Sequence, residues 1–297
     1  MILKGQNFRI IIGTTCVGMA TNCTVTLTNN VESATTKDVV GLADMPVMTN
    51  QSWQVQVGSL LMSDVGALLT SMKNLVQFGL IWDETSTTDN YSALGSDFAR
   101  TGMAYLTDFT ATFDDRTNSV KNLTFTGTGP LSKMQTPVVS GGSNTQTFTK
   151  GQFVRLFLSS DNTTAPSKVI AAARQLSLHV SMSVENSTTK DTEDNWQVQE
   201  PTALNYDIST SALVRGNDTI TSAVTAQDIA SIEDIYEAGT PVKWQIANVS
   251  GDNQRTKGSV IVSGSCLIQT LTINAENRAA ATYQANMVGY GEYVVGA

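Results

Sequence analysis

The sequence is poor in charged residues and has almost no histidine. Only 15% of the 297 residues are Asp, Glu, Lys or Arg, and His179 is the single histidine. Catalytic triads need a base beside serine or cysteine, and that base is usually histidine. His179 lies on the polar face of a predicted strand, at a position where a repeat described below places Thr26. We therefore predict that the chain is not an enzyme and has no catalytic residue.

Metal and phosphate motifs are also missing. The three cysteines, Cys16, Cys23 and Cys266, lack metal or redox spacing, which predicts free buried thiols. There is no P-loop, HExxH or CxxC pair. The acidic pair Asp114-Asp115 belongs to a turn-like stretch with too few regularly spaced oxygens for calcium. We expect neither a metal nor a cofactor.

Long apolar runs are absent as well. The N-terminal stretch "MILKGQNFRIIIGTTC" turns polar too soon for a signal peptide or a membrane span, so it predicts a strand. The net charge of −8 disfavours tight binding to nucleic acid, which needs Lys and Arg on phosphates. The same charge is compatible with a protein that must avoid holding DNA.

An internal repeat is the strongest feature that the sequence does contain. "VESATTKD" (31–38) returns as "VENSTTKD" (184–191), 153 positions later, and the same offset aligns Trp53 with Tyr206. A second block, with offset 162, aligns "FTATFDDR" (109–116) with "LTINAENR" (271–278) and Trp82 with Trp244, without a gap from Leu80 to Gly129. Repeats of this kind indicate duplicated structural units.

A third block completes the order, because "GQNFRI" (5–10) matches "GQFVRL" (151–156) at offset 146. Three blocks in the same order predict two copies of one domain. We place the first copy at 1–145, the second at 151–297, and a Ser/Gly/Thr-rich linker at about 136–150.

Each copy alternates apolar and polar residues at the period of a β-strand, as in "CTVTLT" (23–28) and "LSLHVS" (176–181). One helix interrupts each copy. The first is predicted from a cap at Ser63 or Asp64 through a stripe that includes Val76, ending at Gly79. The second follows a capping-box pattern at Thr225 and Asp228 and ends at Gly239.

The pattern predicts an α+β, predominantly β fold class, with one helix flanking the sheet of each copy. Two long polar segments, 29–52 and 183–205, are expected to be loops between strands, and both contain "TTKD". The pairs Gly127/Gly129 and Gly289/Gly291 end strands rather than open helices, so we interpret them as bulges or strand ends and not as phosphate loops.

The order of these motifs resembles the major tail (tail tube) proteins of long-tailed bacteriophages. The resemblance rests on the "TTKD" loop, the Trp-led strand, the strand "GMAYLTDFTATFDDR" and the final G-x-G, and it covers nearly all of each copy. It implies two tandem tail-tube-like β-sandwich or barrel domains, each with a flanking helix. Six such domains form a ring, and the rings stack into a hollow tube that passes genomic DNA.

Because two copies are fused, three chains would close a pseudo-sixfold ring. The resemblance also implies a tape-measure protein and tail-end adaptor proteins as partners, with transient passage of double-stranded DNA and no membrane. The place of action would be the virion, after assembly in the host cytoplasm. Two alternatives remain: a two-domain carbohydrate-binding or adhesin β-sandwich, and the inner tube of a contractile injection system.

Two groups of residues follow from this hypothesis. The loop residues expected to contact the next ring or subunit are Glu32, Thr35, Thr36, Lys37, Asp38, Glu185, Thr188, Thr189, Lys190 and Asp191. The strand residues expected to face the bore are Thr24, Thr26, Gln54, Gln56, Thr110, Thr112, Thr124, Thr126, Ser177, His179, Ser181, Asp207, Ser209, Thr270 and Thr272.

Overall fold

The structure is a computed structural model, and it describes residues 5, 8–13, 15–17, 20–35, 44–60, 65–82, 98–133, 149–190, 195–214, 226–250 and 256–296. The first half contains β1 (Phe8–Ile12), β2 (Thr15–Cys16), β3 (Ala20–Ser33), β4 (Pro46–Leu60), α1 (Val65–Ser71), β5 (Val76–Trp82), β6 (Phe98–Asp114) and β7 (Val120–Lys133). After a single 3-10 turn at Gly151–Phe153, the second half contains β8 (Val154–Leu158), β9 (Lys168–Ile170), β10 (Ala173–Asn186), β11 (Gln199–Leu213), β12 (Ala226–Gln227), α2 (Ile229–Ala238), β13 (Val242–Ser250), β14 (Thr256–Asn274) and β15 (Thr282–Val295).

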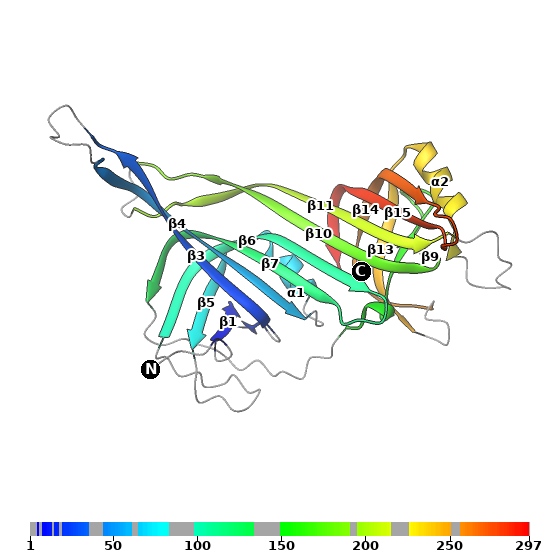
Figure 1. Cartoon of the computed structure of the whole chain (residues 1–297), viewed down its shortest axis with the longest axis horizontal. Helices are drawn as coiled ribbons and strands as arrows, with labels where there is room; N and C mark the ends of the chain where they lie inside the picture. Colours follow the sequence, from blue (N-terminus) through cyan, green and yellow to red (C-terminus); the bar gives the residue numbers. More distant parts are fainter. Residues whose placement is uncertain are drawn as a thin grey trace.

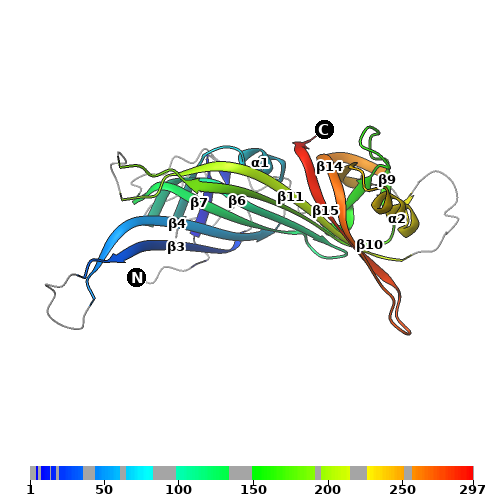
Figure 2. The ribbon, with the colours of Figure 1, turned by 90° about the horizontal axis from the view of Figure 1, so that it is seen from above.

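The described strands all belong to one sheet (Figure 1). Eight of them follow one another in the order β3-β4-β7-β6-β10-β11-β15-β14, and every neighbouring pair is antiparallel. Figure 2 shows these long strands lying side by side across both halves of the molecule. The predicted α+β, predominantly β fold class is confirmed.

Each half folds back on its own part of the sheet. In the first half, β5 is separated from β4 by β6 and β7, yet the rings of Phe78 and Trp53 lie 5.8 Å apart. In the second half, β13 is separated from β11 in the same way, and Trp244 lies 5.7 Å from Tyr206. Side chains of non-neighbouring strands meet like this when a sheet curls into two packed layers. The apolar core lies between those layers.

Strand β6 joins the two halves because its two ends have different partners. Its first residues, Phe98–Ala104, pair with β5. Its last residues, Asp108–Asp114, pair with β10 on the edge that β5 has left, while β7 pairs along the opposite edge. The second half therefore continues the sheet of the first half rather than packing against it as a separate body.

The two halves carry the same irregularities at equivalent positions. The register of β3 with β4 shifts between Ala20 and Asn22, and that of β10 with β11 shifts between Ala173 and Gln175, 153 residues later. The register of β6 with β7 shifts between Leu106 and Asp108, and that of β14 with β15 shifts between Ile268 and Thr270, 162 residues later. Since β-bulges re-aim strands locally, both halves bend at the same places.

The G-x-G pairs lie inside strands β7 and β15, and each provides room for an aromatic ring. A Cβ on Gly127 would lie 2.0 Å from Cε2 of Trp53, and a Cβ on Gly289 would lie 2.6 Å from the ring of Tyr206. Gly129 and Gly291 both have left-handed backbone, with φ of 70° and 76°. The register shifts next to Gly129 and Gly291 agree with the interpretation as bulges. The expectation that the pairs end strands was wrong, because β7 continues to Lys133 and β15 to Val295.

Both helix predictions need correction at their ends. Helix α1 ends at Ser71, and Val76 and Gly79 belong to strand β5, so the first predicted helix was too long. Its expected cap residues, Ser63 and Asp64, lie outside the described residues. The apolar residue Val76 continued the helical spacing by coincidence, because it packs against the core from strand β5, where it is partly buried.

The second helix begins at a different cap from the one predicted. Asp228 itself is the N-cap of α2, and its side chain accepts a hydrogen bond from the backbone N–H of Ser231. Thr225 lies outside the described residues. Gly239 ends the helix in the left-handed conformation, φ 59°, as predicted.

Most of the described residues in the two segments predicted to be long loops belong to strands. Strand β3 continues to Ser33 and β4 begins at Pro46, so much of 29–52 is a projecting β-hairpin (Figure 1, upper left). In the second half, β10 extends to Asn186 and β11 begins at Gln199. The alternation was invisible in the first hairpin because both of its faces are exposed, so apolar residues such as Val31, Val47 and Met48 do not mark a buried face. We call these hairpin ends, 29–50 and 182–204, the first arm and the second arm.

One alignment made from sequence was wrong. Trp244 pairs with Gly264 on the neighbouring strand, and the equivalent pair in the first half is Phe78 with Gly102. Phe78, rather than Trp82, is therefore the counterpart of Trp244, and the offset between β5 and β13 is 166. The identity of two tryptophans outweighed the spacing of the strands in the sequence comparison.

The main apolar core draws buried residues from both halves. It runs from Trp53 and Phe125 in the first half to Tyr206 and Trp244 in the second. The division into domains 1–145 and 151–297 stays a prediction, and most of the predicted linker lies outside the described residues.

Candidate assembly surface

One face of the eight-stranded run is largely polar, with Val120, Leu267 and Val288 as exposed apolar exceptions. Paired residues form rows that cross both halves of the chain. One row consists of Thr24, Gln56, Thr124, Asp108, Ser181 and Asn205, each paired with the next. A second row consists of Thr112, Ser177, Ser209, Asn286 and Thr270. Neither row contains lysine or arginine.

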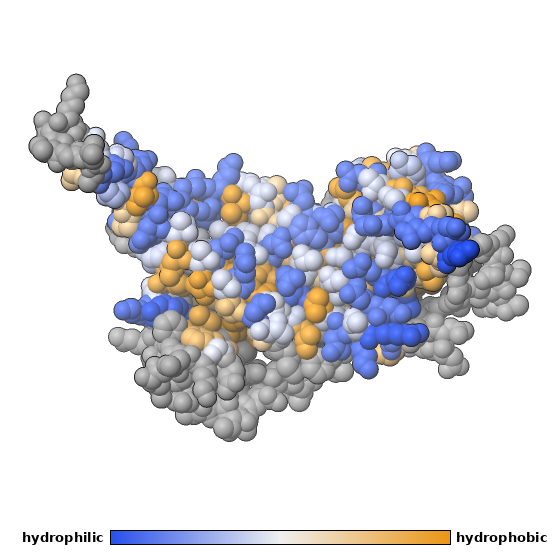
Figure 3. Space-filling view, in the orientation of Figure 1, coloured by the Kyte–Doolittle hydropathy of each residue, from blue (hydrophilic) through white to orange (hydrophobic). Residues whose placement is uncertain are grey.

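The structure brings the fifteen predicted bore residues together on this face. Each alternates with residues directed to the core, as Ser177 and Ser181 do with the buried Leu178 and Val180. None of the fifteen is buried. In the view of Figure 3 the centre of the molecule is mostly hydrophilic, and hydrophobic residues gather toward the side of β3 and β5. That this face lines a bore stays a prediction.

His179 lies between two carboxylates where the halves meet. Its Nδ1 is 2.8 Å from Oδ1 of Asp207 on β11, and its Nε2 is 2.8 Å from Oδ2 of Asp108 on β6. Partial burial lowers the pKa of His179, but the hydrogen bonds and charges of Asp108 and Asp207 outweigh it and raise that pKa above 6.5. The protonated ring can donate to both carboxylates at once, which ties β6, β10 and β11 together.

Sequence reasoning did not find Asp108 as a partner of His179. The bulge between Leu106 and Asp108 interrupts the alternation of β6, so the face of Asp108 could not be read from spacing. The two residues are also 71 positions apart. The alternation of Phe109–Phe113, which follows the bulge, could have been extended back by one residue to place Asp108 on the polar face.

The two predicted loop motifs close the tips of the arms in the same way. The hydroxyl oxygen of Thr35 accepts the N–H of Met45 at 3.1 Å, and that of Thr188 accepts the N–H of Val198 at 2.9 Å. The N–H of Ala34 donates to the carbonyl of Met45, and the N–H of Ser187 to that of Val198. The first threonine of each "TTKD" thus links the two strands of its arm.

Asp44 adds further hydrogen bonds at the end of the first arm. Its carboxylate accepts hydrogen bonds from the hydroxyls of Ser33 and Thr35 and from the N–H of Met45, and these bonds lower its pKa below 3.8. The other loop residues are placed as follows. Glu32, Glu185, Thr189 and Lys190 are exposed, whereas Thr36, Lys37, Asp38 and Asp191 lie outside the described residues. Their contacts with other chains stay predictions.

The second arm docks on the first half of the same chain. Gln51 donates its N–H to the carbonyl of Asn195 at 2.6 Å, and Gln197 donates back to the carbonyl of Gln51 at 2.8 Å. The N–H of Gly129 donates to the carbonyl of Gln197 at 2.8 Å. Sequence reasoning missed this lateral contact, because it pairs backbone groups far apart in the chain.

Helix α1 makes a third contact between the halves. The Tyr293 hydroxyl of β15 donates to the Leu69 carbonyl of α1 at 2.9 Å. Next to it, Lys73 and Glu292 form an ion pair at 3.2 Å with exposed side chains, which contributes little stability. We call these three contacts together the internal joint: the pairing of β6 with β10, the docking of the second arm on the first half, and the contact of α1 with β15.

Among the described residues, no group of three or more His, Cys, Asp or Glu side chains could hold a metal ion. Burial raises the pKa of Cys23 to about 11 and that of Cys266 to about 12, so both thiols are protonated at neutral pH. The side chain of Cys16 lies outside the described part. No helix within the described ranges is long and apolar enough to span a membrane.

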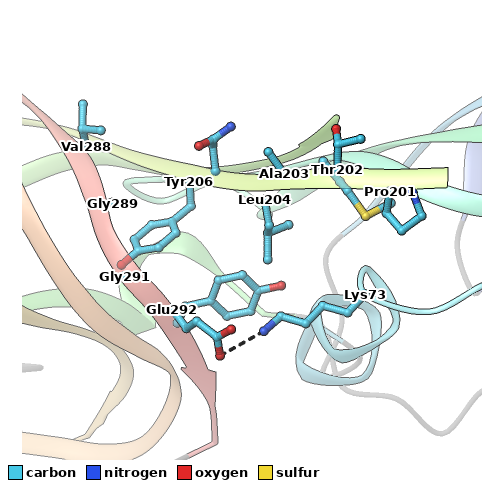
Figure 4. A pocket seen from close by; sticks show the side chains of 13 residues that line it. Lys73, Pro201, Thr202, Ala203, Leu204, Tyr206, Val288, Gly289, Gly291 and Glu292 are labelled. Atoms are coloured by element: carbon cyan, nitrogen blue, oxygen red, sulfur yellow. Dashed lines mark ion pairs between the residues drawn. The ribbon is translucent and has the colours of Figure 1, made fainter. Parts of the chain in front are cut away.

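A cavity of about 540 Å³ lies beneath β11 and β15 (Figure 4). It is lined by Pro201–Tyr206 on one side, by Val288, Gly289, Gly291–Tyr293 on another, and by Lys73. Among the residues that line it, the only acid and base are Glu292 and Lys73, which pair with each other.

No protein-family model and no curated protein matches the chain. Among solved structures it is similar to a chain from the tail of an empty gene transfer agent particle with C6 symmetry, with 16% identity over 49% of this chain and 95% of the other, and a TM-score of 0.37. It is also similar to a chain from a native gene transfer agent virion (15% identity, 50% and 99% coverage, TM-score 0.36) and to the SPP1 tail tube protein (15%, 50% and 78%, 0.36). TM-scores this low carry no weight of their own, and the function has to follow from the sheet and its edges.

Proposed function

We propose that this chain is a structural subunit of a bacteriophage tail tube. Three chains would form a pseudo-sixfold ring, and the rings would stack into a hollow tube through which genomic DNA passes. The observation that carries the proposal is the largely polar face that extends over eight antiparallel strands, four from each half of the chain. We propose a structural and not a catalytic role, in the virion.

The number of strands fits a channel of useful width. Three chains with eight strands each would give a barrel of twenty-four strands. With strands about 4.8 Å apart and tilted by about 40°, such a barrel is roughly 50 Å across between backbones. Side chains would leave a bore of about 40 Å, which is wide enough for a DNA duplex.

The chemistry of the polar face suits a channel that DNA must leave again. Lysine or arginine on the bore would bind phosphates, and the contacts of many stacked rings would add up. The paired rows instead carry hydroxyl and amide groups, with Asp108, His179 and Asp207 as a charged group at the centre. These groups keep the surface wet while they offer DNA little attraction.

The ends of the eight-stranded run also favour assembly. The outer edge of β3, beyond its pairing with β4, has no partner strand among the described residues. Exposed strand edges associate readily, and closed assemblies remove them. The loop residues of the arms would contact the next ring or the neighbouring chain, and a tape-measure protein and tail-end adaptors would be the other partners.

Electron microscopy of the purified chain tests this function directly. We expect rings or tubes with a central hole in negative stain, and a ring mass of three chains by light scattering. A chain that stays monomeric at high concentration and binds glycans would instead indicate an adhesin-like module.

A further inference from the structure

The strand pairing at the internal joint has a counterpart for each of its two edges elsewhere in the chain. In the described structure these two counterpart edges are not paired with each other. Within the chain, residues Asp108–Asp114 of β6 pair with Gln175–Ser181 of β10. The counterpart of this β6 segment is the end of β14, whose residues Leu267–Asn274 pair only with β15 in the described structure. The counterpart of β10 is β3, which pairs only with β4 there. Figure 2 shows the end of the β14–β15 hairpin projecting from the body.

Burial differs between the joint and these open edges. At the joint, Val180 of β10 is 1% exposed and Ala111 of β6 is 0% exposed. Their counterparts by the offsets of 153 and 162 are Leu27, which is 61% exposed, and Ile273, which is 47% exposed. Large aliphatic side chains thus lie open at the positions that the joint covers, and a partner that completes the joint would bury them.

We infer that the partner is a second copy of this chain, which pairs its β3 with the end of β14 in the register of the internal joint. This inference rests on the proposed function and specifies the contact that closes the ring. Another copy offers the matching strand, since the described part of each chain has one open edge on β3 and one on the end of β14. The contact is head-to-tail, as closed rings of identical chains require.

The register follows from the repeat. His179 pairs with Thr110 in the internal joint, so Thr26 of one chain would pair with Thr272 of the next. On the apolar side, Val180 pairs with Phe109, so Leu27 would pair with Leu271. The bulges that aim β6 and β14 are at equivalent positions, which supports the transfer of register from one to the other.

The cavity of Figure 4 gives this contact a second part. The second arm docks on Asn50, Gln51 and Gly129, and the counterparts of these residues are Ala203, Leu204 and Gly291. All three counterparts line the cavity. The cavity is therefore the equivalent of the arm-docking site, and the first arm of the next chain would fill it. By the same equivalence, the Gly291 N–H would donate to the carbonyl of that chain's Asp44.

The contact between chains would differ from the internal joint in one respect. The counterparts of Asp108, His179 and Asp207 are Thr270, Thr26 and Gln54. A ring would thus alternate joints that contain a charged cluster with joints that contain hydroxyl and amide groups. Because the two halves are fused, the joints that contain the charged cluster lie inside each chain, and the joints between chains contain the hydroxyl and amide groups.

Disulfide trapping tests the register. We would replace Cys16 and Cys23 with serine and compare Thr26→Cys/Thr272→Cys with the diagonal control Thr26→Cys/Thr270→Cys under mild oxidation. Directly opposed residues have Cβ atoms about 5 Å apart and diagonal ones about 7–8 Å, which is too far for a disulfide. Thr112→Cys/Ser177→Cys, which are paired within the chain, check that oxidation works.

The expected result is intermolecular disulfides for the direct pair, at least tenfold more than for the diagonal pair, and electron microscopy of the same samples separates the outcomes. Rings that show no cross-link, or only the diagonal one, would overturn the inferred joint and leave the tube function standing. Cross-linked chains in open filaments without a bore would support the joint and refute the tube function. A chain that stays monomeric would overturn both.

A surface variant provides an independent check. Leu27→Asp adds charge to an exposed side chain on the open edge, so the chain should fold normally and fail to assemble. Val120→Asp is the matched control, because Val120 is an exposed aliphatic residue on β7, away from both open edges. Equal assembly of the two variants would overturn the inference.

Discussion

Single glycines determine how the aromatic residues pack in each half. Trp53 lies directly over Gly127, and its Nε1 donates to the Gly129 carbonyl at 3.0 Å. Tyr206 lies over Gly289 in the same manner, and its hydroxyl donates to the Ser265 carbonyl at 2.5 Å. In both halves, the absence of a Cβ on a glycine thus makes room for an aromatic ring, which is tryptophan in the first half and tyrosine in the second.

Gly127→Ala should be strongly destabilising. The new methyl group would displace the Trp53 ring, and we expect the free energy of unfolding to fall by about 3 kcal/mol, as overpacked cores do. Urea denaturation followed by circular dichroism measures this. Gly79→Ala is the control, because its Cβ would lie 3.6 Å from Ile11, an ordinary contact, and should change stability little. Similar losses in both variants would contradict the role of ring packing.

The His179 cluster should make stability depend on pH. Because the folded pKa of His179 is raised, its stabilising effect is fully present below its ordinary value of 6.5 and is lost as pH rises through the folded pKa. Wild-type protein should thus lose urea resistance as the pH rises above 6.5, and His179→Thr, which installs the counterpart residue, should lose less. Asp207→Asn should fall between the two. An unchanged pH dependence in His179→Thr would refute the assignment.

At the scale of elements, local signals determined the ends of α2 better than those of α1. Asp228 and Gly239 both act through backbone geometry within one turn of the helix. At the end of α1, an apolar residue that belongs to β5 mimicked helical spacing. Strand β6 is the element with the largest consequence, because its change of partner joins the two halves.

Asp228→Ala should weaken α2. The carboxylate accepts from both the N–H and the hydroxyl of Ser231, and loss of such a cap costs about 1 kcal/mol. The pKa of Asp228 is lowered by these bonds, so the contribution is present above pH 3.8 and lost as pH falls through the folded pKa. Thermal unfolding near neutral pH measures the difference. Asp234→Ala, an exposed mid-helix change, is the control and should be nearly neutral.

At the scale of the whole molecule, the polar face should govern how assembled tubes treat DNA. Thr124→Lys together with Ser209→Lys puts two cations per chain on this face, at residues that neither open edge uses. We expect assembled tubes of this variant to retain DNA at low salt, with retention falling steeply as salt rises. Filter binding across a salt series measures it. Tubes with Thr240→Lys, an exposed residue after α2, should bind no more than wild type; equal binding would show that the face does not line the bore.

The sequence by itself determined what depends on neighbouring residues. Alternation placed Thr24, Ser177 and their equivalents on one face, the repeat matched the halves, and Gly239 located the end of α2. These features follow from backbone geometry over a few residues, so a local pattern contains them.

Only the tertiary structure decided which edges meet. Period-two alternation is the same for a central strand and an edge strand, so it could not show that β10 completes β6 while the equivalent edge of β14 stays open. Nor could it bring Asp108 to His179, or the second arm to Gln51, because these contacts join residues many positions apart. The faces of the strands are local properties, whereas their partners are chosen by the burial of apolar side chains and the pairing of backbone groups throughout the sheet.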